Sequence, residues 1–225
     1  MGAGDPGRGL RRPTRATVEQ LLKPVAQQPS TRERLVAAGF ETLCAEGFAR
    51  TSARSIARRA GVNQALVFYH FGGVTELLLA ALDASGQRRR ERYEEALRGA
   101  RTPTQLVDAM AKLHEEDQAS GHSRVLTELF AASLAAPALG PELIRRMEPW
   151  VDLTASLIHD FLRETPFASL IEPRVAAQAV LSLYLGVDLL DHVRPNGGDA
   201  TQFFREARRL AAAFEPMFPS EEAKP

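Results

Sequence analysis

The chain has 225 residues, of which 44% are hydrophobic and 25% charged, and its 28 basic residues equal its 28 acidic residues. These ordinary globular values exclude a wholly disordered chain, a collagen-like repeat and a disulfide-rich scaffold. The single cysteine, Cys44, excludes an intrachain disulfide and a cysteine-based zinc site. No run approaches the roughly 20 apolar residues that span a bilayer, and the N-terminus lacks the apolar region of a signal peptide. We therefore expect a cytoplasmic protein with no membrane partner.

The neutral total hides a division of charge along the chain. Residues 1–73 carry eleven basic and five acidic residues, a balance of +6, and the remainder carries the opposite balance of −6. Such asymmetry indicates that only the N-terminal third meets a polyanion. Chance clustering of charges on solvated faces would give the same count.

In chain order, the first segment is residues 1–29, which are rich in Gly, Pro, Arg and Gln and predict a disordered basic arm. From Ser30 onward apolar residues recur at three- and four-residue spacing, which indicates helices. Gly, Pro and capping residues divide this region into nine expected helices, at about residues 31–46, 53–60, 64–70, 74–97, 103–119, 122–135, 141–164, 173–193 and 199–218. Residues 219–225 predict a disordered tail. No stretch alternates with a period of two, so the sequence predicts an all-α fold.

A hairpin of two short helices is the most informative local feature. Residues Ser52–Phe71 read SARSIARRAGVNQALVFYHF, which combines a short helix, an Ala-Gly turn and a second, capped helix. This is the order of a helix-turn-helix, whose second helix enters the major groove of DNA. Gly61 can adopt the positive φ of the tight turn, and Asn63 can accept free N–H groups of the second helix. Helical hairpins are common, so this motif alone does not establish DNA binding.

The longer string TSARSIARRAGVNQALVFYHFGGVTELL, which begins at Thr51, resembles the tetracycline-repressor (TetR) family of bacterial regulators. The matching positions are Thr51, Ile56-Ala57, Ala60-Gly61-Val62, Phe68-Tyr69-His70-Phe71 and Glu76-Leu77-Leu78. The specific resemblance covers about residues 31–82; beyond them only length, element order and helical character match. The resemblance implies a DNA-binding domain at residues 30–75 and a ligand-binding and dimerisation domain at residues 76–218.

The resemblance also implies which residues meet DNA. Arg54 and Gln64 stand where family members contact base edges, and geometry permits Arg to bind guanine and Gln to bind adenine bidentately. Ser52, Tyr69 and His70 are placed near phosphates. A solvated face would present the same side chains. The predicted DNA-binding set is Ser52, Arg54, Asn63, Gln64, Ala65, Leu66, Phe68, Tyr69, His70 and Thr75.

Two positions depart from the family pattern. The family usually has Tyr where Phe68 stands and Lys where Val74 stands, so two positioning contacts to phosphate are absent. The Thr75 hydroxyl, the N–H groups of the following helix or the Arg-rich arm could replace them. Fewer phosphate contacts predict a shallower salt dependence of DNA binding.

The C-terminal part shows weaker signals. The resemblance implies a ligand cavity, and several polar or aromatic residues lie on otherwise apolar faces, although each could equally be core or surface. The candidates are His114, Glu128, Phe130, Trp150, Thr154, His159, Tyr184 and Asp188. No repeated Glu-x-x-His pair, Gly-rich phosphate loop or Gly-x-Ser-x-Gly motif occurs. We therefore expect no enzymatic activity, no cofactor and no metal site.

The last two helices predict the dimer interface. Both look too apolar for helices with a solvated side, which suggests burial by a partner, although packing on the monomer core would look similar. The candidates are Val175, Ala179, Leu183, Gly186, Val187, Leu190, Phe203, Ala207, Leu210 and Phe214.

Together these features predict a homodimeric, sequence-specific transcriptional regulator, a repressor released from a palindromic operator by a small-molecule effector. Such a protein would associate with the nucleoid when bound to DNA. The alternative is an all-α ligand-binding or scaffolding protein whose helix-turn-helix no longer reads DNA, and Phe68 and Val74 are its support. The ligand and the operator sequence do not follow from the residues.

Overall fold

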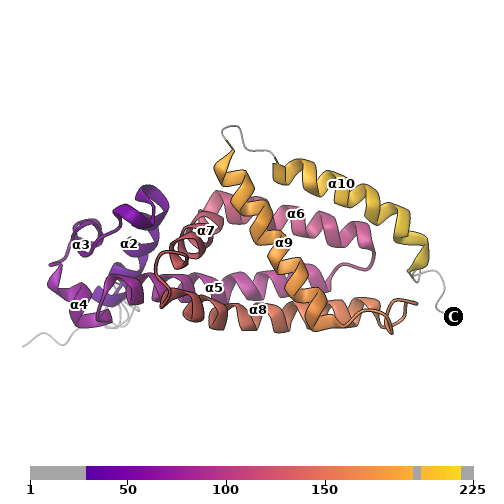
Figure 1. Cartoon of the computed structure of the whole chain (residues 1–225), viewed down its shortest axis with the longest axis horizontal. Helices are drawn as coiled ribbons and strands as arrows, with labels where there is room; N and C mark the ends of the chain where they lie inside the picture. The colour runs from indigo at the N-terminus through magenta and orange to yellow at the C-terminus, as the bar shows by residue number, and fades with distance from the viewer. Residues whose placement is uncertain (1–28, 195–198, 219–225) are drawn as a thin grey trace, which may run out of the picture. The chain divides into compact units, whose positions relative to one another are not determined.

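The computed structural model describes residues 29–194 and 199–218 (Figure 1). Within these residues the chain forms nine α-helices, two short 3-10 turns and no strand, so the predicted all-α fold is confirmed. The elements are α2 (Thr31–Glu46), η1 (Phe48–Arg50), α3 (Ala53–Ala60), α4 (Ala65–Phe71), α5 (Val74–Arg98), α6 (Pro103–Ser120), α7 (His122–Ser133), α8 (Leu139–Leu162), α9 (Pro173–Val193), α10 (Asp199–Phe214) and η2 (Glu215–Met217). The predicted arm up to residue 28 and the predicted tail at 219–225 lie outside the described residues.

Local capping explains where the two short helices α3 and α4 begin and end. The Ser52 hydroxyl accepts a hydrogen bond from the Ser55 N–H, and the Ser55 hydroxyl accepts one from the Ser52 N–H, which forms a reciprocal cap of α3. Gly61 ends α3 at φ 64°, a left-handed conformation that favours glycine. The Asn63 side chain accepts the Ala65 N–H at 2.8 Å, as the sequence predicts.

The start of α8 and the end of α10 differ from the expected boundaries, and proline explains both. α8 begins at Leu139, two residues before the expected start, because Pro141 fits within the first helical turn, where N–H groups have no partner. α10 ends at Phe214 rather than near Phe218. Pro216 lies in the η2 turn directly after it, and its ring would clash with a carbonyl of a continuing α-helix.

One hydrophobic core joins the N-terminal helices to the rest of the described unit. Ile56 of α3 and Val67 of α4 are fully buried, and they belong to the same cluster as Leu78 of α5 and Leu129 of α7. Gly39 of α2 lies directly against the Leu77 side chain of α5. The absence of a side chain at Gly39 lets the two helices approach closely, which fixes α5 against the helix-turn-helix.

The C-terminal helices surround a space bounded by α5, α7, α8 and α9. α8 packs against both α5 and α9, and α10 packs against α6 and α9 (Figure 1). Helices from Thr31 onward belong to one compact unit. Among the described residues no single helix has the length and apolar character to cross a membrane; α4 and α5 reach that threshold only as a pair bent by 64°.

Candidate nucleic-acid interface and ligand cavity

The turn between α3 and α4 is held from α2. The Arg34 guanidinium donates hydrogen bonds to the carbonyl oxygens of Ala60 and Gly61, which are the last residue of α3 and the turn glycine. These two bonds satisfy carbonyls that the end of α3 leaves without helical partners. Arg34 therefore ties the turn of the hairpin to α2.

Most basic side chains described in this region have protein partners. Arg50 donates to the Glu46 carbonyl oxygen at 2.9 Å, and Arg59 lies 3.6 Å from the Glu46 carboxylate. Arg32 lies over the ring of Phe71, 5.0 Å from its centroid. Arg54 and Arg58 are exposed one turn apart on α3, and no ion pair holds either of them among the described residues. Of the basic side chains described in this region, Arg54 and Arg58 are thus the two that stay available to a partner, on the helix that precedes α4.

The outward face of α4 carries an unusual amount of exposed aromatic surface. Val67 points inward and is fully buried, whereas Phe68 is 55% exposed and Tyr69 is 81% exposed. Gln64 and Ala65, at the start of the helix, are exposed as well. A seven-residue helix with one buried side chain and an exposed polar and aromatic face is suited to contact another macromolecule.

The first turn of α5 already holds an acidic group. The carboxylate of Glu76 folds back over Gly73, the residue that precedes the helix. A negative charge at a helix N-terminus is favourable, because the helix dipole and the free N–H groups point toward it. A phosphate approaching the same N–H groups would meet this carboxylate, so they are a poor replacement for the family lysine that Val74 replaces.

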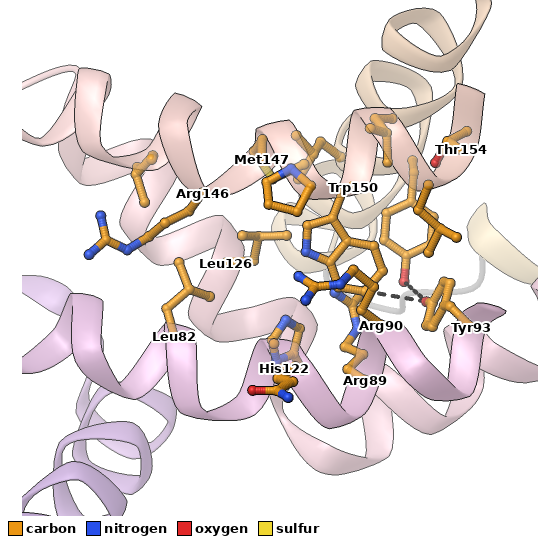
Figure 2. Close-up of a pocket in the computed structure, with 18 of the residues that line it drawn as sticks. Leu82, Arg89, Arg90, Tyr93, His122, Leu126, Arg146, Met147, Trp150 and Thr154 are labelled. Atoms are coloured by element: carbon orange, nitrogen blue, oxygen red, sulfur yellow. Dashed lines mark hydrogen bonds between the residues drawn. The ribbon is translucent and has the colours of Figure 1, made fainter. Parts of the chain in front are cut away.

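A cavity of about 340 Å³ lies between α5, α7, α8 and α9 (Figure 2). Its walls are mostly apolar, with leucines from all four helices and Met147 from α8. Figure 2 shows Arg89, Arg90 and Tyr93 on the α5 side, with Trp150 of α8 beside them. This volume and this mainly apolar surface with interspersed polar groups are typical of small-molecule sites.

A buried carboxylate organises one end of the cavity. Asp117 of α6 is fully buried and accepts hydrogen bonds from Arg89 Nε at 2.6 Å, from the Tyr93 hydroxyl at 2.6 Å and from the Tyr184 hydroxyl at 3.0 Å. Burial by itself would raise the pKa of Asp117, but the hydrogen bond and charge of Arg89 outweigh it and the pKa is lowered. Asp117 is therefore ionised, and it ties α5, α6 and α9 together.

A second buried polar pair lies nearby on α6 and α9. His114 Nδ1 faces Asp188 Oδ1 at 3.4 Å, and Gln118 donates to the same Oδ1 at 3.2 Å. Neither His114 Nδ1 nor Asp188 Oδ2 completes a hydrogen bond with a described residue. Burial raises the pKa of Asp188, and the nearby His114 opposes this effect.

Comparison with known proteins identifies the N-terminal region. Residues 35–81 match the sequence profile of the family described as bacterial regulatory proteins, tetR family. Residues 35–81 carry the helix-turn-helix region of the tetR family. Two Pseudomonas putida proteins, the HTH-type transcriptional regulator SrpR and the uncharacterized HTH-type transcriptional regulator TtgW, are each 38% identical over 27% of this chain. These matches span only 28% of SrpR and 45% of TtgW.

Longer similarities extend over the whole tetR fold. The HTH-type transcriptional regulator BetI 2 of Chromohalobacter salexigens is 27% identical, over 84% of this chain and 89% of its own length. The structure of the fatty acid degradation regulator FadR from Bacillus halodurans aligns with a TM-score of 0.69 at 14% identity, over 82% of this chain and 96% of that chain. At this identity the structural match shows the fold alone.

Within the tetR helix-turn-helix, the predicted DNA-binding residues fall into two groups. Those with exposed side chains and no capping role are Arg54, Gln64, Ala65, Phe68 and Tyr69. The others are partly engaged: Ser52 and Asn63 cap α3 and α4, Leu66 packs against the core, and His70 and Thr75 are half-buried. Only the first group presents whole side chains to a partner.

The predicted pocket residues also divide. Phe130, Trp150, Thr154 and Tyr184 line the cavity. His114 and Asp188 lie outside the cavity lining because they face each other in the buried pair between α6 and α9. Glu128 points toward the helix-turn-helix, where its carboxylate accepts the Phe48 N–H at 2.8 Å. His159 is exposed on α8.

The cavity contains polar residues that the sequence reasoning missed, above all Arg89, Arg90, Tyr93 and His122. Those on α5 were missed because the charged run of α5 suggests a solvated face. Their spacing nevertheless indicates a shared face of the helix, because Arg89 follows Leu82, and Tyr93 follows Gly86, by seven residues.

The predicted dimer residues lie on α9 and α10, where several large apolar side chains are exposed. Val175 is 63% exposed, Leu183 52% and Leu210 64%; Ala179, Leu190 and Phe214 are exposed too. Gly186, Val187, Phe203 and Ala207 are half-buried. Among the described residues nothing covers this apolar surface, so it is available to a second molecule.

Proposed function

We propose that the protein is a homodimeric transcriptional regulator that reads a palindromic operator through α4 and acts as a repressor released by a small molecule. Its DNA-binding domain would comprise residues 30–75, and residues 76–218 would bind the ligand and form the dimer. Such a regulator works in the cytoplasm, at the nucleoid when bound to DNA. The observation that carries the proposal is the exposed face of α4 with Arg54 beside it, in a family of regulators.

In this proposal the two sides of the hairpin share the work of recognition. Arg54 and Gln64 contact base edges, Ala65 and Leu66 meet apolar groups of thymine, and Tyr69 contacts phosphate. Ser52, Asn63, His70 and Thr75 assist at the backbone, and Phe68 contributes apolar surface only. Because Glu76 occupies the N-terminus of α5 and Val74 carries no charge, the number of phosphate contacts is small.

The exposed apolar residues of α9 and α10 form the dimer interface in this proposal. A two-fold dimer presents two copies of α4 to half-sites about one helical turn apart, which explains why the operator would be palindromic. A ligand in the cavity would favour a dimer geometry that no longer matches successive grooves. α5 transmits the change, since it begins beside the hairpin and forms one wall of the cavity.

Selection from random DNA duplexes tests the proposal. Enrichment of a palindrome supports the proposal. If no sequence is enriched, the result supports the alternative of an all-α ligand-binding or scaffolding protein. The exposed phenyl ring of Phe68 is consistent with that alternative.

Arg54→Ala and Gln64→Ala provide the residue-level test. Each variant should weaken binding to the selected duplex about tenfold or more, because a good bidentate base contact contributes about 1–3 kcal/mol. The control is Arg88→Ala, which removes one positive charge from an exposed site on α5. Gel-shift titration at a single salt concentration compares the four proteins. Unchanged affinity of Arg54→Ala and Gln64→Ala, with dimer and fold intact, would remove both residues from the interface.

A further inference from the structure

The walls of the cavity favour a ligand with a mainly apolar body. Most of its lining surface is apolar and comes mainly from leucines together with Met110, Phe130, Met147 and Trp150, with polar and charged side chains between them. Apolar walls of this kind favour an apolar ligand body, since burying it removes apolar surface from water.

The charges around the cavity are not balanced. Four arginines line it: Arg89, Arg90, Arg145 and Arg146. Three of them form ion pairs with carboxylates: Arg89 pairs with Asp117, and Arg145 and Arg146 pair with Glu142. Arg146 also pairs with Asp83, which itself lines the cavity. Arg92, outside the lining, also pairs with Asp117 and with Glu116. These five arginines therefore face four carboxylates, which leaves an excess of one positive charge.

Arg90 carries that excess. It is half-buried in the cavity wall, and among the described residues no hydrogen-bond acceptor or carboxylate is paired with it. His122, the other basic group in the wall, adds no charge at neutral pH, because burial lowers the pKa of His122 to about 3. A partly desolvated guanidinium without an anion is an incomplete site, since its charge-assisted hydrogen bonds have no acceptor.

The aromatic side chains do not make this cavity a site for cations. Aromatic faces attract cationic ligands such as quaternary ammonium groups. Here the Arg89 guanidinium already lies 4.6 Å from the Trp150 ring centroid and 4.8 Å from that of Tyr93. A cationic ligand would have to displace Arg89 from these rings. Otherwise it would be repelled by the positive charges of Arg89 and Arg90.

We infer that this cavity binds a small amphipathic carboxylate, whose apolar body fills the leucine-lined space and whose anionic group pairs with Arg90. This inference rests on the proposed function, because it names the chemical class of the effector for the same ligand site. It requires one negative charge on the ligand, which neutralises the single positive excess of the wall.

The single tryptophan of the chain provides a direct readout. Trp150 lies in the cavity wall, so its fluorescence reports occupancy without any DNA. The probes are decanoate, 1-decanol and decyltrimethylammonium, which share an alkyl chain and differ in charge, each below its micelle-forming concentration at neutral pH. We expect decanoate to bind about tenfold more tightly than 1-decanol, and the ammonium to bind most weakly.

Arg90→Gln tests the residue itself. It should weaken decanoate binding about tenfold and leave 1-decanol binding unchanged, whereas the control Arg88→Gln, an exposed site outside the cavity on the same helix, should change neither. Three results would overturn the inference: equal or tighter binding of the alcohol or the ammonium, an equal loss for all three probes in Arg90→Gln, or no fluorescence response to any probe. None of these measurements involves DNA, so duplex selection still judges the proposed function separately.

Discussion

Two buried basic side chains of the cavity wall have pKa values shifted in opposite directions. His122 and Arg89 are both buried, and burial disfavours the charged form of each. For His122 burial lowers the pKa to about 3, because Asp117 offsets the effect only in part. For Arg89 burial also acts to lower the pKa, but Tyr93 and Asp117 outweigh it and the pKa is raised. The wall thus combines a neutral imidazole with a permanent cation.

Replacing His122 with Gln tests the lowered pKa of His122 through the pH dependence of the unfolding free energy. In the unfolded chain the imidazole takes up a proton below about pH 6.5, whereas in the folded protein it stays neutral to about pH 3. The stabilisation from neutral His122 is therefore complete above about pH 6.5 and is lost as the pH falls toward 3. Between pH 7 and pH 5 the wild type should lose roughly 2 kcal/mol more unfolding free energy than His122→Gln. Urea unfolding at one protein concentration measures this difference, and parallel pH profiles of the two proteins would contradict it.

Individual helices follow from local residues, whereas their contacts do not. Gly61, Pro103 and Pro173 mark helix ends that the structure reproduces within a residue or two. The η1 turn at Phe48–Arg50 was not predicted, since it depends on an acceptor 80 positions away, the Glu128 carboxylate on the Phe48 N–H. The partners of Arg89 were missed for the same reason. Periodicity shows which face of a helix is apolar but not which side chains of other helices meet it.

Two glycines in different surroundings, Gly39 at the contact between α2 and α5 and Gly86 within α5, should respond to substitution in opposite ways. Gly39→Ala places a methyl group into the fully buried Leu77 side chain, so it should destabilise the protein by about 1–3 kcal/mol despite the better helix propensity of alanine. Gly86→Ala, within α5, meets no atom within 4 Å and should stabilise by up to about 1 kcal/mol. Chemical denaturation of both variants checks the pair. If Gly39→Ala were as stable as Gly86→Ala, the close approach of the two helices would be refuted.

For the molecule as a whole, the structure shows which of the basic residues in the N-terminal third have protein partners. Of the basic residues described before α5, Arg34 and Arg59 serve the protein itself, by fixing the hairpin turn and pairing with Glu46. Arg54 and Arg58 remain on the surface beside α4. The asymmetry therefore points to the region that the proposal places on DNA, and the structure separates the arginines that hold the domain together from those on the surface.

The proposed assembly can be tested on the exposed face of α9. Leu183→Glu places a charge in the predicted interface and should raise the dimer dissociation constant at least about 30-fold, the factor for roughly 2 kcal/mol. Leu170→Glu is the matched control, because Leu170 is 77% exposed in the segment between α8 and α9, outside that interface. Sedimentation equilibrium compares both variants with the wild type. A dimer unaffected by Leu183→Glu would place the interface elsewhere.

The position of Glu128 on α7 has a thermodynamic consequence. The same helix contributes His122, Leu126 and Phe130 to the cavity and holds the η1 turn through Glu128. In the proposed regulator, a ligand that shifts α7 must stretch or break this bond to Phe48. Coupling between two binding sites is reciprocal, so operator DNA would then weaken ligand binding by the same factor by which the ligand weakens operator binding. Effector affinity measured on the free protein would accordingly overstate the affinity of the DNA-bound form.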